Sequence, residues 1–258
     1  MKKKKTTLGF KILKGLIHLF YGNVEVVGLE NLPEKNAIIV GNHSQTNGPI
    51  TAEIFMPDNC YIWCSGEMMS AKEVPEYAFR DFWSHKRKWV QPFYRLLAHL
   101  IVPIAVCLFN NARTIPVYHD MRIKTTFKES LKKLQEGINL IIFPEKDEQY
   151  NHILYQFQEH FVDVAKMYHR KSGEALTFVP LYIAPRMRKA FVGKGIEFDP
   201  ENTISDERER IIAYLMNEIT DMAENLPKHT VVPYRNMSRR LYVSNKDKGV
   251  LPGEKTSC

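Results

Sequence analysis

The sequence predicts an α/β domain with a mostly parallel central sheet flanked by helices. Three observations support this fold class. Short, almost wholly apolar segments recur at 37–40, 138–143 and 176–183, as expected for strands that are buried on both faces. Segments with helical spacing of apolar residues, at 123–136 and 205–225, lie between or after them. Alternation of strands and helices along a chain is typical of a parallel sheet.

The remaining elements extend the same pattern. The helix at 123–136 carries Phe127, Leu131 and Leu134 on one face and stops at Gly137, a residue suited to a helix C-terminus. The helix at 205–225 is expected to open at Ser205. We also expect strands at 23–30, 61–64, 114–118 and 191–198, a helix beginning near 50, and helices covering 70–88, 89–109 and 155–168.

Composition limits the kinds of partner. The 258 residues are 44% hydrophobic, enough for one sizeable globular domain. The excess of 36 Lys and Arg over 29 Asp and Glu gives a net charge of +7, which favours an anionic partner. No nucleic-acid motif accompanies this charge, so we expect no nucleic-acid partner. Cys60 and Cys64 lie four apart, but no second pair at ligand spacing completes a metal site, and a reduced intracellular setting is the default.

The N-terminal region is expected to form a basic amphipathic helix over residues 1–22. Of positions 9, 12, 13, 16, 17 and 20, which share one helical face, five are apolar, and a Lys run precedes them. Such a helix lies in a membrane interface or packs on the core, and both interpretations stay open. The α/β domain follows at 23–232, and a polar tail at 233–258 is expected to be disordered from Asn245 onward.

A second apolar concentration covers 89–109. Arg95, His99 and Pro103 interrupt it, so we interpret it as a core helix or a membrane-contacting helix, not as a membrane span. Residues 84–119 contain no acidic side chain but several basic ones. This composition suits a phospholipid interface better than DNA, although a core helix with a solvated basic end fits equally well.

The stretch Gly-Asn-His-Ser-Gln-Thr-Asn-Gly-Pro at 41–49 contains the first candidate for chemistry. It directly follows the buried strand at 37–40, and the C-terminal ends of such strands are where α/β proteins place their sites. His43 is the candidate catalytic residue, and the alternative is a loop histidine that merely hydrogen-bonds backbone. Glu145 follows the strand at 138–143, so a parallel sheet would bring it close to His43.

Several motifs occur in a familiar order: NHSQTNGP, then RTIPVYHD, an amphipathic helix, IIFPEK and FVPLYI. Together, over about 22–200, they resemble a divergent member of the glycerolipid, lysophosphatidic-acid type (1-acylglycerol-3-phosphate) acyltransferase family. The resemblance implies transfer of a fatty acyl group from acyl-CoA or acyl-carrier protein to a hydroxyl of a lysophospholipid or related acceptor, with no further cofactor. It also implies that His43 is the general base and that Glu145 helps to bind the acceptor.

The chain departs from the family pattern at three positions. Gly48 stands where an Asp is expected, His119 where an Arg is expected, and Lys146 where a Gly is expected. The missing carboxylate matters most, because such a group orients the histidine and stabilises its charged form. Gln45 and Asn47 are candidates to orient His43 or contact substrate, while Lys146 and Arg113 are candidates to supply positive charge.

These departures leave two functions open. One is an O-acyltransferase that works on the cytoplasmic face of the membrane as a peripheral protein. The other is a catalytically silent lipid-binding or scaffold relative, which the loss of the Asp at position 48 favours. A serine hydrolase built on Ser44 is remote, since no Gly-x-Ser-x-Gly motif occurs.

Overall fold

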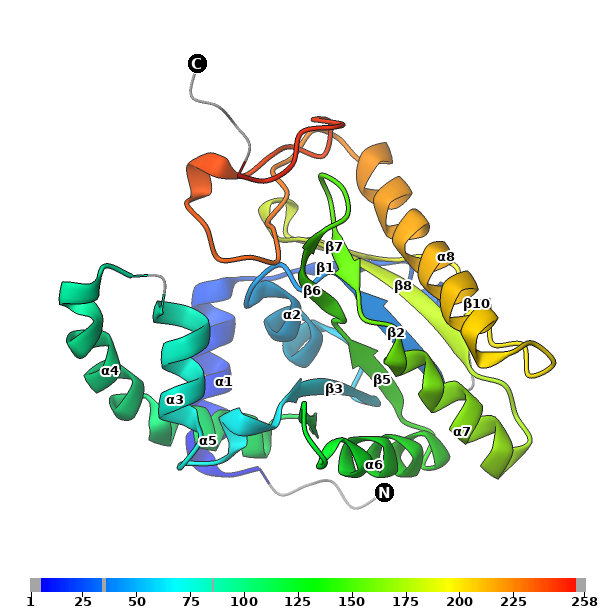
Figure 1. The fold of residues 1–258 in the computed structure, drawn as a ribbon, viewed down its shortest axis with the longest axis horizontal. Helices are drawn as coiled ribbons and strands as arrows, with labels where there is room; N and C mark the ends of the chain where they lie inside the picture. Colours follow the sequence, from blue (N-terminus) through cyan, green and yellow to red (C-terminus); the bar gives the residue numbers. More distant parts are fainter. Residues whose placement is uncertain (1–5, 34–35, 85, 254–258) are drawn as a thin grey trace. The chain divides into compact units, whose positions relative to one another are not determined.

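The computed structural model describes residues 6–33, 36–84 and 86–253. The chain folds as two compact units, each of them built from two stretches of sequence. Unit 1 comprises 1–22 and 62–129, and unit 2 comprises 23–61 and 130–258. Figure 1 shows how helices and strands follow one another along the chain.

The sheet of unit 2 is mostly parallel, which confirms the predicted fold class. Its centre is β2 (Ala37–Gly41), which runs parallel to both of its neighbours, β5 (Asn139–Ile142) and β8 (Thr177–Ala184). Three outer strands extend it: β9 (Lys189–Val192) antiparallel to β8, β1 (Glu25–Val27) parallel to β9, and β10 (Ile196–Glu197) antiparallel to β8. Parallel pairing places the C-terminal ends of β2, β5 and β8 at one edge.

Helices cover the buried strands of unit 2. Every residue of β2 and β5 is buried, so both faces of these strands need a covering layer. In Figure 1, α8 (Ile204–Asn225) lies along β8 beside α7 (Asp163–Ser172), and α2 (Asn47–Phe55) lies on the other side. Ile211, Leu215 and Ile219 form the buried face of α8. Its N-cap is Thr203, whose hydroxyl accepts the Asp206 N–H, and not the predicted Ser205.

Two predicted elements of unit 2 differ from the structure. The helix expected at 155–168 begins as a strand, β7 (Tyr155–Phe157), which pairs with β6 (Glu145–Gln149). The reason is that the Tyr155 N–H bonds to the Glu145 side chain, which holds this segment extended. The strand expected at 191–198 is divided into β9 and β10, and a side chain at Gly195 between them would lie 2.4 Å from the Thr177 methyl group.

Unit 1 contains two parallel strands and several helices. Its strands are β4 (Thr114–Val117) and most of β3 (Cys60–Ser65). Its helices are α1 (Leu8–Tyr21), α3 (Val74–Ala78), α4 (Gln91–Leu100) and α5 (Val102–Asn111). Helix α6 (Ile123–Gln135) begins in unit 1, ends in unit 2 and is followed by Gly137 at φ 79°, as predicted. Short helical turns occupy Leu29–Asn31, Gly66–Met69, Phe79–Trp83, Lys88–Val90, His160–Val162, Pro185–Met187 and Arg239–Leu241.

The apolar stretch at 89–109 forms two helices rather than one. Helix α4 ends before Ile101, and Pro103, which has no N–H to donate, stands at the start of α5. Taken singly, none of the helices in the described ranges has the length and apolarity to cross a membrane. Lys88–Leu100 and Val102–Asn111 meet that criterion together but are bent by 47°.

The N-terminal helix α1 packs within unit 1 by one face. Phe10 is buried, and the N–H of Thr7 donates to the side chain of Asn111 at the end of α5. Leu8, Leu19 and Phe20 remain largely exposed. The helix is therefore attached to unit 1 by one face and keeps another apolar face exposed, and its placement in a membrane interface stays a prediction.

The segment after α8 folds back onto unit 2, where the sequence predicted a polar tail. We name residues 226–253 the C-terminal segment. Asn245, where disorder was expected to begin, is fully buried. Its side-chain amide donates to the carbonyls of Ala223 and Leu226, and its oxygen accepts the His229 N–H. This one side chain satisfies carbonyls left open at the end of α8, a need that the residue pattern does not reveal. Residues 254–258 lie outside the described residues.

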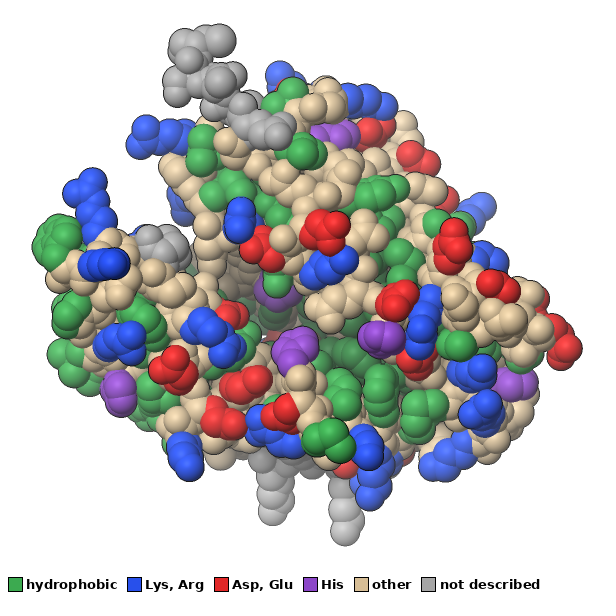
Figure 2. All heavy atoms as spheres, in the orientation of Figure 1, with side chains coloured by type: hydrophobic (Ala, Val, Ile, Leu, Met, Phe, Trp, Pro, Cys, Tyr) green, Lys and Arg blue, Asp and Glu red, His purple; other side chains and the backbone are tan. Residues whose placement is uncertain are grey.

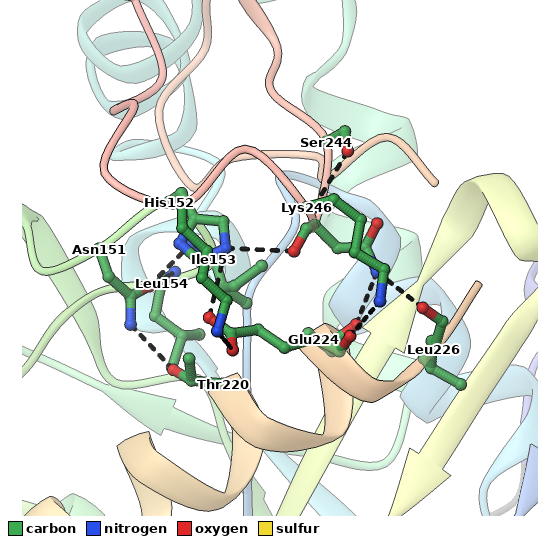
Figure 3. A network of polar contacts seen from close by, with 12 residues as sticks. Asn151, His152, Ile153, Leu154, Thr220, Glu224, Leu226, Ser244 and Lys246 are labelled. Carbon is green, nitrogen blue, oxygen red and sulfur yellow. Dashed lines mark hydrogen bonds and ion pairs between the residues drawn. The ribbon is translucent and has the colours of Figure 1, made fainter. Parts of the chain in front are cut away.

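A polar network holds the same segment at a second place (Figure 3). Glu224 of α8 contacts His152 at 3.6 Å and pairs with Lys248, and its carbonyl accepts from Lys246. His152 is buried, and its Nε2 lies 3.2 Å from the carbonyl of Asn245. The C-terminal segment is therefore a fixed part of unit 2.

Candidate functional site

The candidate site is built around the loop 42–48 at the C-terminal end of β2, which we call the His43 loop. The first residue of the loop, Asn42, is hydrogen-bonded to the neighbouring strand β8. The Asn42 Oδ1 accepts the Ile183 N–H at 2.7 Å, and its Nδ2 donates to the Ile183 carbonyl at 3.0 Å and to the Ser44 Oγ at 2.7 Å. Because Asn42 is buried, these bonds extend the sheet by one side chain and give His43 a fixed starting point.

The His43 loop then turns tightly. Ser44 and Gln45 have φ angles of 45° and 57°, a left-handed conformation that few non-glycine residues adopt. The Gly48 N–H donates to the His43 carbonyl at 2.9 Å, and the Asn47 Nδ2 donates to the Ser44 carbonyl at 2.7 Å. The observed hydrogen bond of the Asn47 side chain is thus used inside the loop.

Glu145, which follows β5, comes next to the His43 loop as the sequence predicted. Its Oε1 accepts the backbone N–H of His43 at 2.6 Å, and its Oε2 accepts the Tyr155 N–H at 2.9 Å. The carboxyl is buried, and this burial raises its pKa from 4.5 to about 7, while the two backbone N–H groups act in the opposite direction. The carboxylate therefore positions the backbone of His43.

Two aromatic rings frame the imidazole of His43. Phe143, from the end of β5, stands edge-on with ring centroids 5.5 Å apart and an interplanar angle of 72°. Tyr234, from the C-terminal segment, stands edge-on at 5.7 Å and 87°. The Nδ1 atom of His43 is shielded from solvent, while the residue as a whole is half-buried. Two rings of this kind limit the rotation of the imidazole.

The C-terminal segment makes further contacts with the His43 loop. The Gln45 Nε2 donates to the Tyr242 hydroxyl at 2.8 Å and to the Arg235 carbonyl at 3.2 Å. Tyr234 also packs against Tyr155, with ring centroids 5.6 Å apart. Gln45, which the sequence suggested as a group to orient His43, instead connects the loop to the C-terminal segment.

The predicted site residues are divided between the two units. His43, Gln45, Asn47 and Glu145 lie in unit 2, in the His43 loop or bonded to it. Lys146 is exposed in β6 and pairs with Glu148 at 2.7 Å. Arg113 and His119 belong to unit 1. The Arg113 carbonyl accepts the Ile62 N–H beside β4, and His119 is exposed just after that strand.

Sequence reasoning missed three residues of the site: Asn42, Tyr234 and Tyr242. Asn42 stands next to His43 at the end of an apolar run, so a buried amide that continues the sheet could have been foreseen. Tyr234 and Tyr242 lie 191 and 199 residues further on in a polar stretch without periodicity, and no local signal connects them with His43.

Position 48 of the His43 loop has no space for the Asp that the family pattern has there. A Cβ atom at this position would lie 2.6 Å from the carbonyl oxygen of His43 and 3.0 Å from the ring of Phe143. Backbone atoms cannot yield as a flexible side chain does, so any side chain here requires the loop to move. The loop is therefore built for glycine at position 48.

The structure also bears on metal binding and on the distribution of surface charge. In the described part of the chain, no group of three or more His, Cys, Asp and Glu side chains is arranged to hold a metal ion. Acidic and basic side chains are interspersed over the face of the molecule shown in Figure 2. The net charge of +7 is thus not displayed there as one continuous basic surface.

Comparisons with known proteins add little beyond this geometry. No protein-family model matches the sequence, and a search of curated proteins finds no match. Among solved structures, the chain is similar to PlsC, the 1-acyl-sn-glycerophosphate (LPA) acyltransferase from Thermotoga maritima, at 15% identity with a TM-score of 0.46. The similarity covers 85% of this chain and 81% of that one.

Proposed function

We propose that this protein is an O-acyltransferase that moves a fatty acyl group from acyl-CoA or acyl-carrier protein to a hydroxyl of a lysophospholipid-like acceptor. The observation that carries this proposal is the contact between His43 and Glu145. The two residues come from separate motifs 102 positions apart, and the 2.6 Å bond joins them at one edge of the sheet. His43 is thereby held at the C-terminal end of a buried parallel strand, which is where α/β proteins place their sites.

In the proposed reaction, a ring nitrogen of His43 takes the proton of the acceptor hydroxyl. The oxygen attacks the thioester carbonyl, the C–O bond of the ester forms and the C–S bond breaks. The departing thiolate then receives the proton from the imidazolium, so that atoms and charge balance. Glu145 acts on the backbone of His43, and Phe143 and Tyr234 hold the ring.

Mass spectrometry of products tests this proposal. Acyl-CoA and acyl-carrier protein are offered with mixed lysolipids to the wild type, to His43→Ala and to His160→Ala, which removes an exposed histidine of unit 2. We expect an acylated product that His43→Ala lowers about 10²- to 10⁴-fold and His160→Ala leaves unchanged. A product that persists in His43→Ala would contradict the assignment of the base.

The second candidate function is a catalytically silent lipid-binding relative. Gly48 favours it, because the loop has no room for the carboxylate that usually supports such a histidine. Absence of product from the wild type, together with undiminished binding of lysolipid by both the wild type and His43→Ala, would select this function.

We further propose that the protein acts as a peripheral protein on the cytoplasmic face of a membrane, where its acceptor resides. Support comes from α4 and the turn before it, in unit 1. Trp89, Phe93, Leu96 and Leu100 recur at spacings of four, three and four and are 59–78% exposed. The opposite face of α4 is buried within unit 1, since Ala98 packs against Phe79. Basic residues 86–88 adjoin the stripe and suit anionic lipid.

Sedimentation with lipid vesicles tests the membrane proposal. The double variant Trp89→Ser/Phe93→Ser is expected to bind phosphatidylglycerol vesicles at least tenfold more weakly than the wild type, because two large apolar side chains no longer insert. Met167→Ser, which removes an exposed apolar side chain from α7, is the matched control. Equal binding by all three proteins would refute the role of α4.

A further inference from the structure

The C-terminal segment contains a short loop whose two ends are hydrogen-bonded to the His43 loop. We call residues 235–242 the arginine loop. At its start the Arg235 carbonyl, and at its end the Tyr242 hydroxyl, accept hydrogen bonds from the same Nε2 of Gln45. Tyr234, directly before it, contacts the ring of His43. The arginine loop is therefore attached to the candidate site through Gln45, which follows His43 by two residues.

Its position is secured from behind as well. The N–H of Val231 donates to the carbonyl of Val243 at 2.9 Å, which closes the base of the loop. Tyr242 and Val243 are buried, and Asn245 beyond them caps α8. A loop that is closed at its base and attached at its rim presents its exposed residues in a defined place.

The exposed part of the loop is basic. Arg235, Arg239 and Arg240 point their side chains to the surface, and no acidic residue lies between them. Arg235 pairs with Asp147 at 3.0 Å. For Arg239 and Arg240, no carboxylate among residues 6–33, 36–84 and 86–253 lies within 4.0 Å of the guanidinium. Two planar cations are thus available on the surface of a loop whose two ends are bonded to Gln45.

We infer that Arg239 and Arg240 bind a phosphate ester of the substrate while its reacting group lies at His43. A guanidinium offers parallel N–H donors that match phosphate oxygens, which makes adjacent arginines suitable for this ligand. The inference rests on the proposed function, which supplies two sources of phosphate: a phosphorylated acceptor and coenzyme A. It also gives the chain a cation within unit 2, independent of position 119, where the family arginine is replaced by histidine.

Calorimetric titration tests the arginine loop with two probes, sn-glycerol 3-phosphate and coenzyme A. Arg239→Ala/Arg240→Ala is expected to weaken binding of at least one probe about ten- to hundredfold. The probe that is affected names the source of the phosphate. The control Arg170→Ala/Lys171→Ala removes two exposed cations at the end of α7, before β8 begins and hence at the opposite edge of the sheet, and is expected to change neither.

A third variant separates a built site from diffuse attraction between charges. Gln45→Ala keeps every charge but releases the arginine loop, so it is expected to weaken the same probe severalfold. If Arg239→Ala/Arg240→Ala binds both probes like the wild type, or the α7 control loses as much affinity, the inference is wrong. An unchanged affinity in Gln45→Ala likewise overturns the claim that this loop is held for binding.

The outcome is distinguishable from failure of the proposed function. His43→Ala is expected to bind both probes as the wild type does, because it removes no contact to phosphate. Loss of probe binding in Arg239→Ala/Arg240→Ala without any acylated product from the wild type would retain the phosphate site and refute the acyltransferase. Acylated product from a wild type that binds neither probe would retain the acyltransferase and refute the phosphate site.

Discussion

His43 is held from two sides that are built differently. On the strand side, the buried side chains of Asn42 and Glu145 hold the backbone by hydrogen bonds of 2.6–3.0 Å. On the C-terminal side, Tyr234 touches the ring, and Gln45 ties the loop to the buried Tyr242 and to the exposed Arg235. Buried hydrogen bonds are costly to break, whereas aromatic contacts at the rim contribute less. We therefore expect the strand side to determine folding and the C-terminal side to adjust chemistry.

The largest effect is expected from Glu145→Leu, which attacks the strand side. The N–H groups of His43 and Tyr155 would lose their acceptor inside the protein. Each buried donor without a partner costs about 1–3 kcal/mol, so the free energy of unfolding should fall by about 2–6 kcal/mol. Urea denaturation followed by circular dichroism measures this. Glu209→Leu, at an exposed position of α8, is the control, and a similar small loss in both variants would show that Glu145 supports nothing.

The pH dependence of stability gives the next largest effect. Burial raises the pKa of Glu145 from 4.5 to about 7, so between these values the folded state binds a proton that the unfolded state has released. The contribution is therefore fully present below pH 4.5, is lost as the pH rises towards 7 and stays constant above. A pKa raised by this amount corresponds to about 3 kcal/mol.

Urea denaturation at pH 5 and pH 8 tests this dependence in the wild type and in Glu145→Gln. The variant has no titrating group at position 145, so its curve should be flatter over the same window. It should also be less stable at pH 5, because its amide nitrogen faces one of the two N–H donors. Parallel pH curves for the two proteins would show that Glu145 does not titrate in this range.

Gly48 tests whether the strand side tolerates the carboxylate of the family pattern. Gly48→Asp and Gly48→Ala place the same Cβ 2.6 Å from the His43 carbonyl, so both should destabilise the fold by about 1–3 kcal/mol. Neither should increase acyl transfer. Gly15→Ala is the control, since nothing lies within 4 Å of a Cβ there in α1. Higher activity in Gly48→Asp alone would mean that the loop can rearrange around a carboxylate.

The same contrast explains what could be predicted from the sequence. The strand side follows from local patterns, because apolar runs predict β2 and β5 and parallel pairing then brings His43 and Glu145 to one edge. The role of Glu145 was not predictable, since the donors it satisfies are backbone groups that become neighbours only on folding. Gly48 appeared as a departure from a motif, and only the distance to the His43 carbonyl shows its steric cause.

The C-terminal side could not be predicted from local patterns at all. Its attachment depends on Asn245, one polar side chain that satisfies carbonyls at the end of α8, and on Gln45, which reaches two residues of the arginine loop. Neither residue belongs to a periodic apolar pattern. A polar stretch can therefore be folded when single side chains complete hydrogen bonds that regular elements leave open.

Tyr234 gives the smallest effect and separates the two sides most clearly. Tyr234→Ala removes two aromatic pairs, each worth about 0.5–1.5 kcal/mol, so the loss of stability should be smaller than in Glu145→Leu. The ring of His43 would gain freedom to rotate, so kcat should fall severalfold while KM for the acceptor stays constant. Tyr234→Phe retains the edge-on ring and should restore kcat, which a role for the hydroxyl would not permit. If Tyr234→Ala instead raises KM alone, Tyr234 contacts substrate and the C-terminal side acts in binding rather than in positioning His43.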